Sequence, residues 1–310
     1  MPNRPNLFIV GAPKSGTTSL YDYLAGHPDV FMSPIKEPIY FAPDVQAGFK
    51  HRFRFGDDET SYLALYDGSR SEAFRGEAST RYLASPEAPR LIHEFDPGAR
   101  IIVMLRNPID FVYALHNERV SQQAEDVADF EEALALDSER REGRHLPRGS
   151  NALGSVYRDN AMFGRQLERW YAEFPREQVH VIVFDDFARD TPGEFRKVLE
   201  FLAIDPTYRP AAFAIVNPSH RSRGGIARLL MSSRLAHWTR HRLLPAVVGE
   251  DRAARLARRV RHSRLNRRPN PRPPIRDELR AGLEREFEDD VAVLGRLLGR
   301  DLRAEWFSGA

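Results

Sequence analysis

The stretch "LFIVGAPKSGTTSL", residues 7–20, decides the fold because it combines an apolar strand, a glycine-bracketed turn and the start of a helix. Its first four residues are apolar, which suits a buried parallel strand. Gly11 and Gly16 have the spacing of a Walker A motif, G-x-x-x-x-G-K-[ST], but the lysine position of that motif is Thr17. The lysine is instead Lys14, three residues earlier. The turn therefore predicts an anion site whose ammonium group comes from within the loop.

A strand that turns into a helix directs several backbone N–H groups and the positive end of the helix toward one place. Lys14 adds a compact charge, and a lysine at this earlier position suits a shorter anion than a triphosphate. A glycine- and serine-rich turn that binds nothing is the simpler alternative, but packing does not explain so many small and polar residues together. The expected anion-binding residues are Lys14, Ser15, Gly16, Thr17, Thr18 and Ser19.

Strand-like and helical patterns alternate along the rest of the chain, which predicts an α/β fold with a parallel sheet. We expect a P-loop-like central parallel sheet flanked by helices, with an Arg-rich C-terminal helical insertion. Strands are predicted over 7–10, 74–78, 101–105 and 179–184, and helices over 17–25, 110–123, 130–141, 157–174, 191–202 and 278–298.

Charge is concentrated in one part of the 310-residue chain, although the net charge is only +2. Fifteen arginines and only two acidic residues lie between Arg221 and Arg272. We expect a single domain, 1–310, within which 221–274 forms a basic helical insertion or lid. The absence of cysteine excludes disulfides and thiolate metal sites. Since no signal peptide and no apolar run of about 18 residues is visible, a cytoplasmic location is expected.

Several segments together resemble the sulfotransferases that use 3′-phosphoadenosine 5′-phosphosulfate (PAPS). "PKSGTTSL" resembles their 5′-phosphosulfate-binding loop, and "RIIVMLRNPID" resembles the second signature, which grips the 3′-phosphate. "IKEPIYF" is similar to the Lys-Glu-Pro segment of heparan-sulfate and bacterial carbohydrate sulfotransferases. The resemblance implies a PAPS donor, adenosine 3′,5′-bisphosphate as product, and no required metal. Weaker similarity to bacterial members extends through "GEASTRYL", "QLERWYAEFPREQVHVIVFDDF" and "LLGRDLRAEW".

The second signature departs from the family pattern. Arg106 is present and is expected to bind the 3′-phosphate, but the serine whose hydroxyl contacts that phosphate is replaced by Ala114. Arg106 could act with a C-terminal arginine, or His116 could substitute for the serine. Weaker donor binding, or a different donor, would also follow from the replacement.

The resemblance assigns two residues to catalysis. Lys14 is the expected partner of the oxygen that bridges phosphate and sulfate. Glu37 is the expected general base, because Lys36-Glu37-Pro38 matches the segment that carries the proposed base of the heparan-type enzymes. Lys36 and Glu37 are also expected to contact the acceptor, although an ordinary surface ion pair is the alternative.

Three other residues compete for roles at this site. Glu77 in "GEASTRYL" is a candidate for acceptor binding and equally for capping a strand end. Histidine is the base in the cytosolic small-molecule branch of the family, so His93 and His116 are rival bases. His93 is expected on a helix in a structural role, whereas His116 is better placed to bind the acceptor or the 3′-phosphate.

The Arg-rich stretch permits several interpretations. Arg221, Arg223 and Gly224 loosely resemble the C-terminal loop that covers the donor nucleotide. The stretch could also attract an anionic acceptor or lie on an acidic membrane surface as a peripheral contact. A solvated cationic face is the simplest reading. No nucleic-acid partner is expected, because interleaved aromatic residues are missing.

The predicted activity is transfer of the sulfuryl group from PAPS to a hydroxyl or amine of a small-molecule, carbohydrate or lipid-linked acceptor. A P-loop kinase or NTPase is the first alternative, for which Asp185 and Asp186 are the only candidate magnesium ligands. A non-catalytic PAPS-binding module is the second. The sequence does not predict the acceptor or the oligomeric state.

Overall fold

The computed structural model describes residues 3–46, 58–213, 220–222, 267–269 and 274–307. The chain divides into two compact units, one formed by 1–214 with 275–310 and the other by 215–274. In the second unit, β6 (His220–Ser222) and β7 (Arg267–Pro269) form an antiparallel pair. The rest of the fold described below belongs to the first unit.

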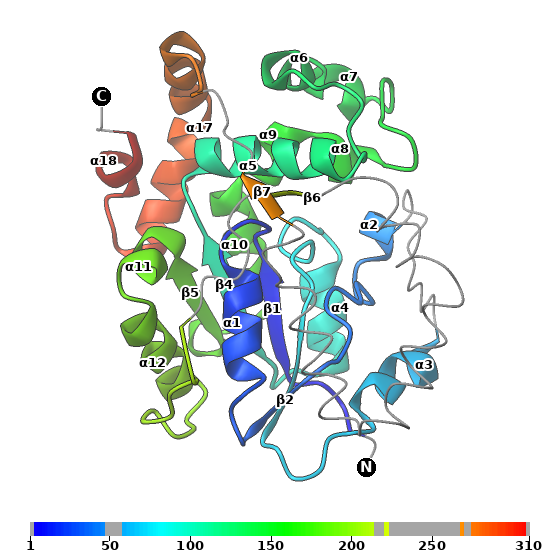
Figure 1. Ribbon diagram of the computed structural model, residues 1–310, viewed down its shortest axis with the longest axis vertical. Coiled ribbons are helices and arrows are strands. Elements are labelled where there is room, and N and C mark those ends of the chain that lie inside the picture. Colours follow the sequence, from blue (N-terminus) through cyan, green and yellow to red (C-terminus); the bar gives the residue numbers. More distant parts are fainter. Residues whose placement is uncertain (1–2, 47–57, 214–219, 223–266, 270–273, 308–310) are drawn as a thin grey trace. The chain divides into compact units, whose positions relative to one another are not determined.

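A five-stranded sheet, with all neighbours parallel, forms the centre of the first unit (Figure 1). Its strand order, β2-β3-β1-β4-β5, places β1 between β3 and β4, so the turn after β1 begins at the middle of the sheet. The parallel sheet confirms the predicted fold class. Of the five strands of this sheet, only β2 was not predicted, because it has three residues. The strands are β1 (Leu7–Gly11), β2 (Val30–Met32), β3 (Phe74–Ala78), β4 (Arg100–Leu105) and β5 (Val179–Val183).

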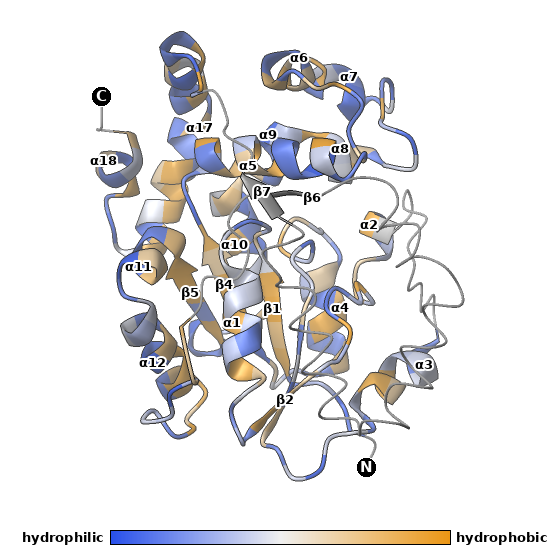
Figure 2. Ribbon diagram, viewed as in Figure 1, coloured by the Kyte–Doolittle hydropathy of each residue, from blue (hydrophilic) through white to orange (hydrophobic). Residues whose placement is uncertain are grey.

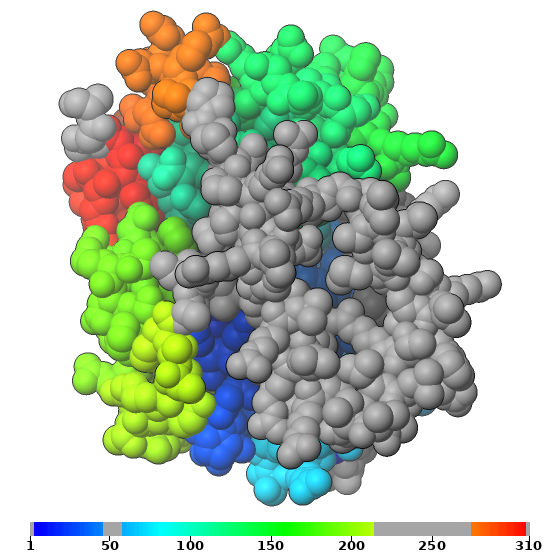
Figure 3. Space-filling model, viewed as in Figure 1, coloured from blue at the N-terminus to red at the C-terminus, as the bar shows by residue number. Residues whose placement is uncertain are grey.

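Helices cover both faces of this sheet, because alternate residues of each strand point to opposite faces. Leu7 and Ile9 pack with α1 (Thr17–Leu24) and α12 (Thr191–Phe201). Figure 3 shows α12 and the turn after it, in yellow-green, beside the blue N-terminal residues. On the other face, Phe8 and Val10 belong to the core that includes α4 (Ala88–Phe95), α10 (Phe163–Glu173) and α17 (Asp277–Leu298). Strands β1, β4 and β5 are largely orange in Figure 2, as expected for strands that are covered on both faces.

Two long helices predicted from the sequence are broken in the structure. The predicted helix over 157–174 divides into α9 (Tyr157–Asn160) and α10. Both carboxylate oxygens of Asp290, on α17, accept hydrogen bonds from the first turn of α10, from the backbone N–H groups of Gly164 at 2.8 Å and Arg165 at 3.0 Å. A tertiary contact therefore caps α10 where the sequence pattern continues. The prediction over 130–141 likewise divides into α6 (Phe130–Ala135) and α7 (Asp137–Arg141).

The helix after β4 begins earlier than predicted. Helix α5 (Pro108–Ser121) starts at Pro108 because the side chain of Asn107 accepts hydrogen bonds from the first free backbone N–H groups. No helix in the described part of the chain has both the length and the apolarity needed to cross a membrane. The remaining elements are α2 (Pro43–Gln46), α3 (Glu59–Leu63), η1 (Ala64–Tyr66), α8 (Ala152–Ser155), η2 (Arg176–Gln178), α11 (Phe184–Arg189) and α18 (Leu302–Phe307).

Candidate anion-binding site

The turn between β1 and α1 has the backbone of an anion cradle. Lys14 has φ of 62° and Gly16 has φ of 88°, so the chain enters the left-handed region twice before α1 begins. Gly16 is the N-cap of α1 and supplies no side chain to cap it. Within the described structure, the backbone N–H groups of Ser15, Gly16, Thr17 and Thr18 find no hydrogen-bond acceptor. These donors at a helix start can therefore bind an anion.

Gly11 is required for packing between two loops, whereas a glycine of a phosphate loop is expected to let the backbone approach the anion. Its φ is 155°, and a Cβ atom there would lie 2.5 Å from Cβ of Leu83 and 2.9 Å from the carbonyl oxygen of Thr80. The backbone N–H of Leu83 also donates to the carbonyl of Val10 at 2.7 Å. Glycine is thus needed so that the turn over residues 79–83, which follows β3, can pack against the end of β1. This contact brings a second loop beside the anion cradle.

Two side chains from α5 and the end of β4 hold Lys14 in place. Lys14 Nζ lies 3.1 Å from Glu118 Oε1, and both side chains are partly exposed. Arg106 Nη1 donates to the carbonyl oxygen of Lys14 at 3.1 Å, and its guanidinium lies over the ring of Phe184 at 5.0 Å. Arg106 also lies 3.6 Å from Asp110, while its buried Nε has no acceptor among the described residues. Arg106 therefore supports the loop and keeps one donor available.

Glu37 lies in the loop that runs beside the end of β3. Its carboxylate accepts hydrogen bonds from Lys36 Nζ at 3.0 Å and from Thr80 Oγ1 at 3.0 Å. Burial acts to raise the pKa of Glu37, but the charges of Lys36 and Arg81 and these hydrogen bonds outweigh it and hold the pKa below its usual value. Glu37 is therefore ionised at neutral pH. Its side chain is 31% exposed, so solvent or an acceptor can reach it.

Arg81 connects the two loops electrostatically. Its charge interacts with the carboxylates of both Glu37 and Glu118. The Lys36–Glu37 pair and the Lys14–Glu118 pair are therefore both influenced by this one arginine. The structure thereby has Lys14, Lys36 and Glu37 on neighbouring loops, together with Glu118 and Arg81, and the roles predicted for the first three stay predictions. Glu118 could have been found from its position one helical turn after Ala114, and Arg81 from its place in "GEASTRYL".

Among the described residues, Glu77 and the two histidines form no hydrogen bond or ion pair with Lys14, Lys36 or Glu37. Glu77 is fully buried and His116 is 2% exposed. His116 Nε2 lies 3.0 Å from the carbonyl oxygen of Val127, its Nδ1 finds no partner in the described structure, and burial lowers its pKa. His93 lies on α4, with its ring 5.3 Å from that of Phe174. His93 thus has packing contacts that suit a structural residue.

The two carboxylates considered as magnesium ligands already have protein partners. Asp185 accepts a hydrogen bond from Trp306 Nε1 at 3.1 Å, and Asp186 forms ion pairs with Arg189 and Arg300. The described residues contain no group of three or more acidic or histidine side chains placed to hold a metal ion. The backbone of Arg221 lies in β6, whereas the predicted donor-binding residues Arg223 and Gly224 lie outside the described residues.

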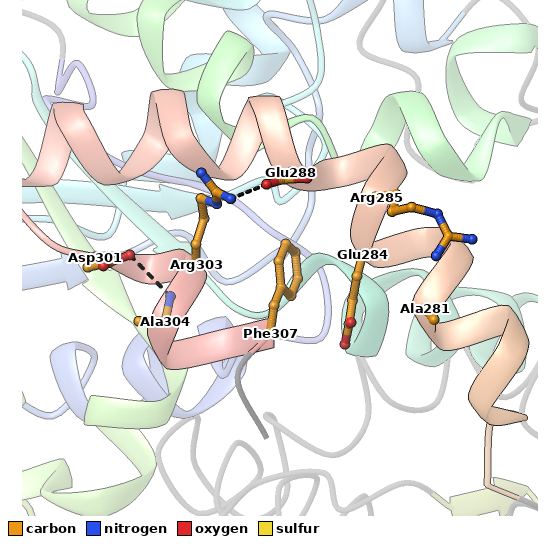
Figure 4. Close-up of a pocket in the computed structure, with 8 residues that line it drawn as sticks. All are labelled: Ala281, Glu284, Arg285, Glu288, Asp301, Arg303, Ala304 and Phe307. Carbon is orange, nitrogen blue, oxygen red and sulfur yellow. Dashed lines mark hydrogen bonds and ion pairs between the residues drawn. The ribbon is translucent and has the colours of Figure 1, made fainter. Parts of the chain in front are cut away.

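A cavity of about 490 Å³ lies between α17 and α18 (Figure 4). In the close-up, Phe307 projects into the space between Arg303 and Glu284, and Arg303 is paired with Glu288. The lining residues include none from the Lys14 loop, the Glu37 loop or α5. The cavity is therefore separate from the charged cluster and does not contribute to it.

Comparisons with known proteins agree with the fold described above. Residues 5–208 match the profile described as "Sulfotransferase family". A solved sulfotransferase from Alicyclobacillus acidocaldarius is 30% identical, with a TM-score of 0.68, over 97% of this chain and 98% of that chain. Human carbohydrate sulfotransferase 15 is 27% identical over 271 residues, which cover 71% of this chain and 47% of that protein. Human bifunctional heparan sulfate N-deacetylase/N-sulfotransferase 3 is 26% identical over 70% of this chain and 24% of that protein. The chain thus spans about half or less of the length of these curated relatives.

Proposed function

Because this chain belongs to the sulfotransferase family, we propose that it transfers a sulfuryl group from PAPS to a hydroxyl or amine of a carbohydrate acceptor. One observation carries the proposal. An ammonium group, Lys14, and an ionised carboxylate, Glu37, stand on neighbouring loops and are linked through the charges of Glu118 and Arg81. The arrangement supports the proposal because sulfuryl transfer needs a group that stabilises an anionic leaving group and a group that accepts a proton.

The residues of the loop fit the donor. The unpaired backbone N–H groups of residues 15–18 and the ammonium of Lys14 suit its 5′-phosphosulfate. The buried Nε of Arg106, which has no described acceptor, suits a second phosphate group. Ala114 offers no hydroxyl there, and His116 is already engaged by a carbonyl, so Arg106 is the side chain on which 3′-phosphate binding depends.

In the proposed reaction, Lys14 acts on the donor and Glu37 acts on the acceptor. The donor supplies the sulfuryl group: its S–O bond to phosphate breaks, with the electron pair left on the phosphate oxygen, as the bond from acceptor to sulfur forms. Lys14 neutralises the charge that grows on the leaving oxygen. Glu37 accepts the proton of the acceptor hydroxyl. Lys36 and Thr80 hold the Glu37 carboxylate in position.

A carbohydrate acceptor is supported by the relatives. The curated proteins matched here include a carbohydrate sulfotransferase and heparan sulfate sulfotransferases. Glu37 also lies in the Lys-Glu-Pro segment that resembles those enzymes. Hydroxyl groups of sugars need a base for transfer at neutral pH, and the ionised Glu37 provides one.

Transfer of radiolabelled sulfate from PAPS to a panel of sugars and glycolipids tests the activity. Lys14→Ala should lower kcat by about 10²–10³-fold, because it removes a preorganised charge from the leaving group. Lys197→Ala is the matched control: this lysine is exposed on α12 and pairs with Glu194 at 2.6 Å, so the variant should keep wild-type turnover. Equal turnover in the two variants would contradict the assignment of Lys14.

Calorimetry separates the proposal from its alternatives. The wild-type protein should bind adenosine 3′,5′-bisphosphate without a metal and should bind it more tightly than ATP with Mg²⁺. Preference for Mg²⁺–ATP would instead indicate a kinase or NTPase. Tight bisphosphate binding with no transfer to any acceptor would indicate a binding module.

A further inference from the structure

Glu77 is a buried carboxylate at the end of β3, and its hydrogen-bond partners among the described residues are all hydroxyl groups. Its Oε1 accepts hydrogen bonds from Tyr62 at 2.6 Å and from Tyr82 at 3.0 Å, and its Oε2 accepts one from Ser79 at 2.6 Å. No described lysine or arginine forms an ion pair with it. Burying a carboxylate without a positively charged partner costs free energy, which hydrogen bonds offset in part. Such a residue is therefore expected to support part of the fold through those hydrogen bonds.

Two of these hydroxyls also accept hydrogen bonds from the loop that contains Glu37. Ser79 Oγ accepts from the backbone N–H of Ile39 at 3.0 Å, and Tyr82 Oη accepts from that of Phe41 at 3.2 Å. Each hydroxyl thus donates to Glu77 and accepts from the loop. These are two parallel relays from one carboxylate to two alternate residues of the loop.

The backbone between Glu37 and Ile39 requires such support. Glu37 has φ of 64° and Ile39 has φ of 55°, both in the left-handed region that residues with side chains rarely adopt. The backbone N–H of Glu37 donates to the carbonyl of Ala78 at 2.9 Å. The strained backbone of Glu37 and Ile39 persists only where neighbouring contacts impose it. The two relays supply those contacts immediately after Glu37.

We propose that Glu77 is a positioning residue that fixes the Glu37 loop through Ser79 and Tyr82, and so places the Glu37 carboxylate for proton transfer. The proposal rests on the proposed function only for the role of Glu37. The groups facing Glu77 are the hydroxyls of Ser79, Tyr62, Tyr66 and Tyr82 and the charge of Glu37. Above about pH 7, where Glu77 is ionised, its charge polarises Ser79 and Tyr82 and makes their oxygens better acceptors for the loop.

Single substitutions separate the two relays. Ser79→Ala removes the acceptor for Ile39, and Tyr82→Phe removes the acceptor for Phe41. Tyr66→Phe is the matched control, because Tyr66 belongs to the same buried cluster, its hydroxyl lies 3.5 Å from that of Tyr62, and it accepts from no backbone amide of the described residues. Glu77→Gln keeps one carbonyl oxygen and tests the shared carboxylate.

Backbone amide exchange, followed residue by residue by NMR in the ligand-free protein, measures the relays directly. Ser79→Ala should speed exchange at Ile39 by about three- to tenfold, and Tyr82→Phe should do the same at Phe41, as expected for one hydrogen bond. Glu77→Gln should speed both, and Tyr66→Phe should leave both within about twofold. Unchanged exchange in both relay variants, or equal acceleration by Tyr66→Phe, would overturn the proposal.

Turnover gives the second readout. In the relay variants kcat should fall by about tenfold, within the range for a displaced base, while the Kd for adenosine 3′,5′-bisphosphate should stay within about twofold. A merely structural role would change both quantities. Wild-type kcat in both relay variants would also overturn the proposal. If the wild-type protein transfers no sulfate while the exchange results hold, the proposed function fails and the relays stand.

Discussion

Lys14 Nζ and Glu118 Oε1 lie 3.1 Å apart, so the one lysine of the anion loop is paired with a carboxylate from α5. The pair joins residues 104 positions apart in sequence. Because an anion bound in the loop needs the same ammonium, Glu118 competes with it. The acidic partner thereby sets how strongly the loop attracts an anion.

Glu118→Gln should therefore strengthen binding of adenosine 3′,5′-bisphosphate. Removing a partly exposed competing charge is worth up to about 1 kcal/mol, which is at most about a fivefold lower Kd. Calorimetry at low salt measures it, and the difference should shrink at high salt. Glu94→Gln is the control, since Glu94 pairs with Arg90 at 2.7 Å on the exposed face of α4. A higher Kd in Glu118→Gln would show that Glu118 orients Lys14 instead of competing for it.

Glu37→Gln should reduce kcat by about 10²–10⁴-fold, as expected when a general base is lost, and should leave bisphosphate binding nearly unchanged. The pH dependence adds a test through Lys36. Lys36 is the largest of the influences that lower the pKa of Glu37, and burial opposes it. Lys36→Met should therefore raise that pKa and move the acid limb of kcat/KM to higher pH. A limb that stays in place in Lys36→Met would assign the base to another residue.

Regular patterns in the sequence predicted most of the sheet, because β1, β4 and β5 are largely apolar runs close to glycine or proline signals. The strand over 74–78 matches β3 at both ends. The predicted helix over 157–174 was wrong as one element, because Asp290 caps α10 from 126 residues away. A side chain supplied by a distant helix leaves no local signal where it acts.

The same distinction applies to the site. The residues predicted at the anion loop and in Lys36-Glu37 are local in sequence, and the structure brings them together. Glu118 and Arg81 act across loops and were missed. The interpretation of Glu77 as an acceptor ligand stays a prediction, but its full burial and its hydroxyl partners favour a positioning role.

Two buried arginines should differ in how much stability the protein loses when their charge is removed. Arg140 and Glu125 form a bidentate pair at 2.8 and 2.9 Å with no exposed side-chain surface, so Arg140→Met should lower the free energy of unfolding by about 3–5 kcal/mol. Arg119 is 2% exposed and donates to Ser150, but its Nε and Nη1 find no acceptor in the described structure. Arg119→Met should therefore cost less than about 1 kcal/mol. Urea unfolding measures both, and equal losses would show that Arg119 has an acceptor beyond the described residues.

Glu77 should make the stability of the fold depend on pH near neutrality. Burial raises its pKa to about 7 from an ordinary value of 4.5, against the hydrogen bonds from Ser79, Tyr62 and Tyr82. The native state therefore holds a proton that the unfolded chain releases between these values. This bound proton stabilises the native state fully below pH 4.5, and its contribution is lost as the pH rises through about 7. The free energy of unfolding falls by about 3 kcal/mol over this range.

Glu77→Gln cannot titrate and should lack this loss. Its free energy of unfolding, minus that of the wild type, should therefore rise by about 3 kcal/mol between about pH 4.5 and pH 8. Glu177→Gln, at an exposed position in η2, should show no such change and serves as the control. Urea unfolding across this range provides the measurement. A difference that stays constant with pH would mean that Glu77 keeps an ordinary pKa, so the hydroxyl groups around it would fully offset the cost of its burial.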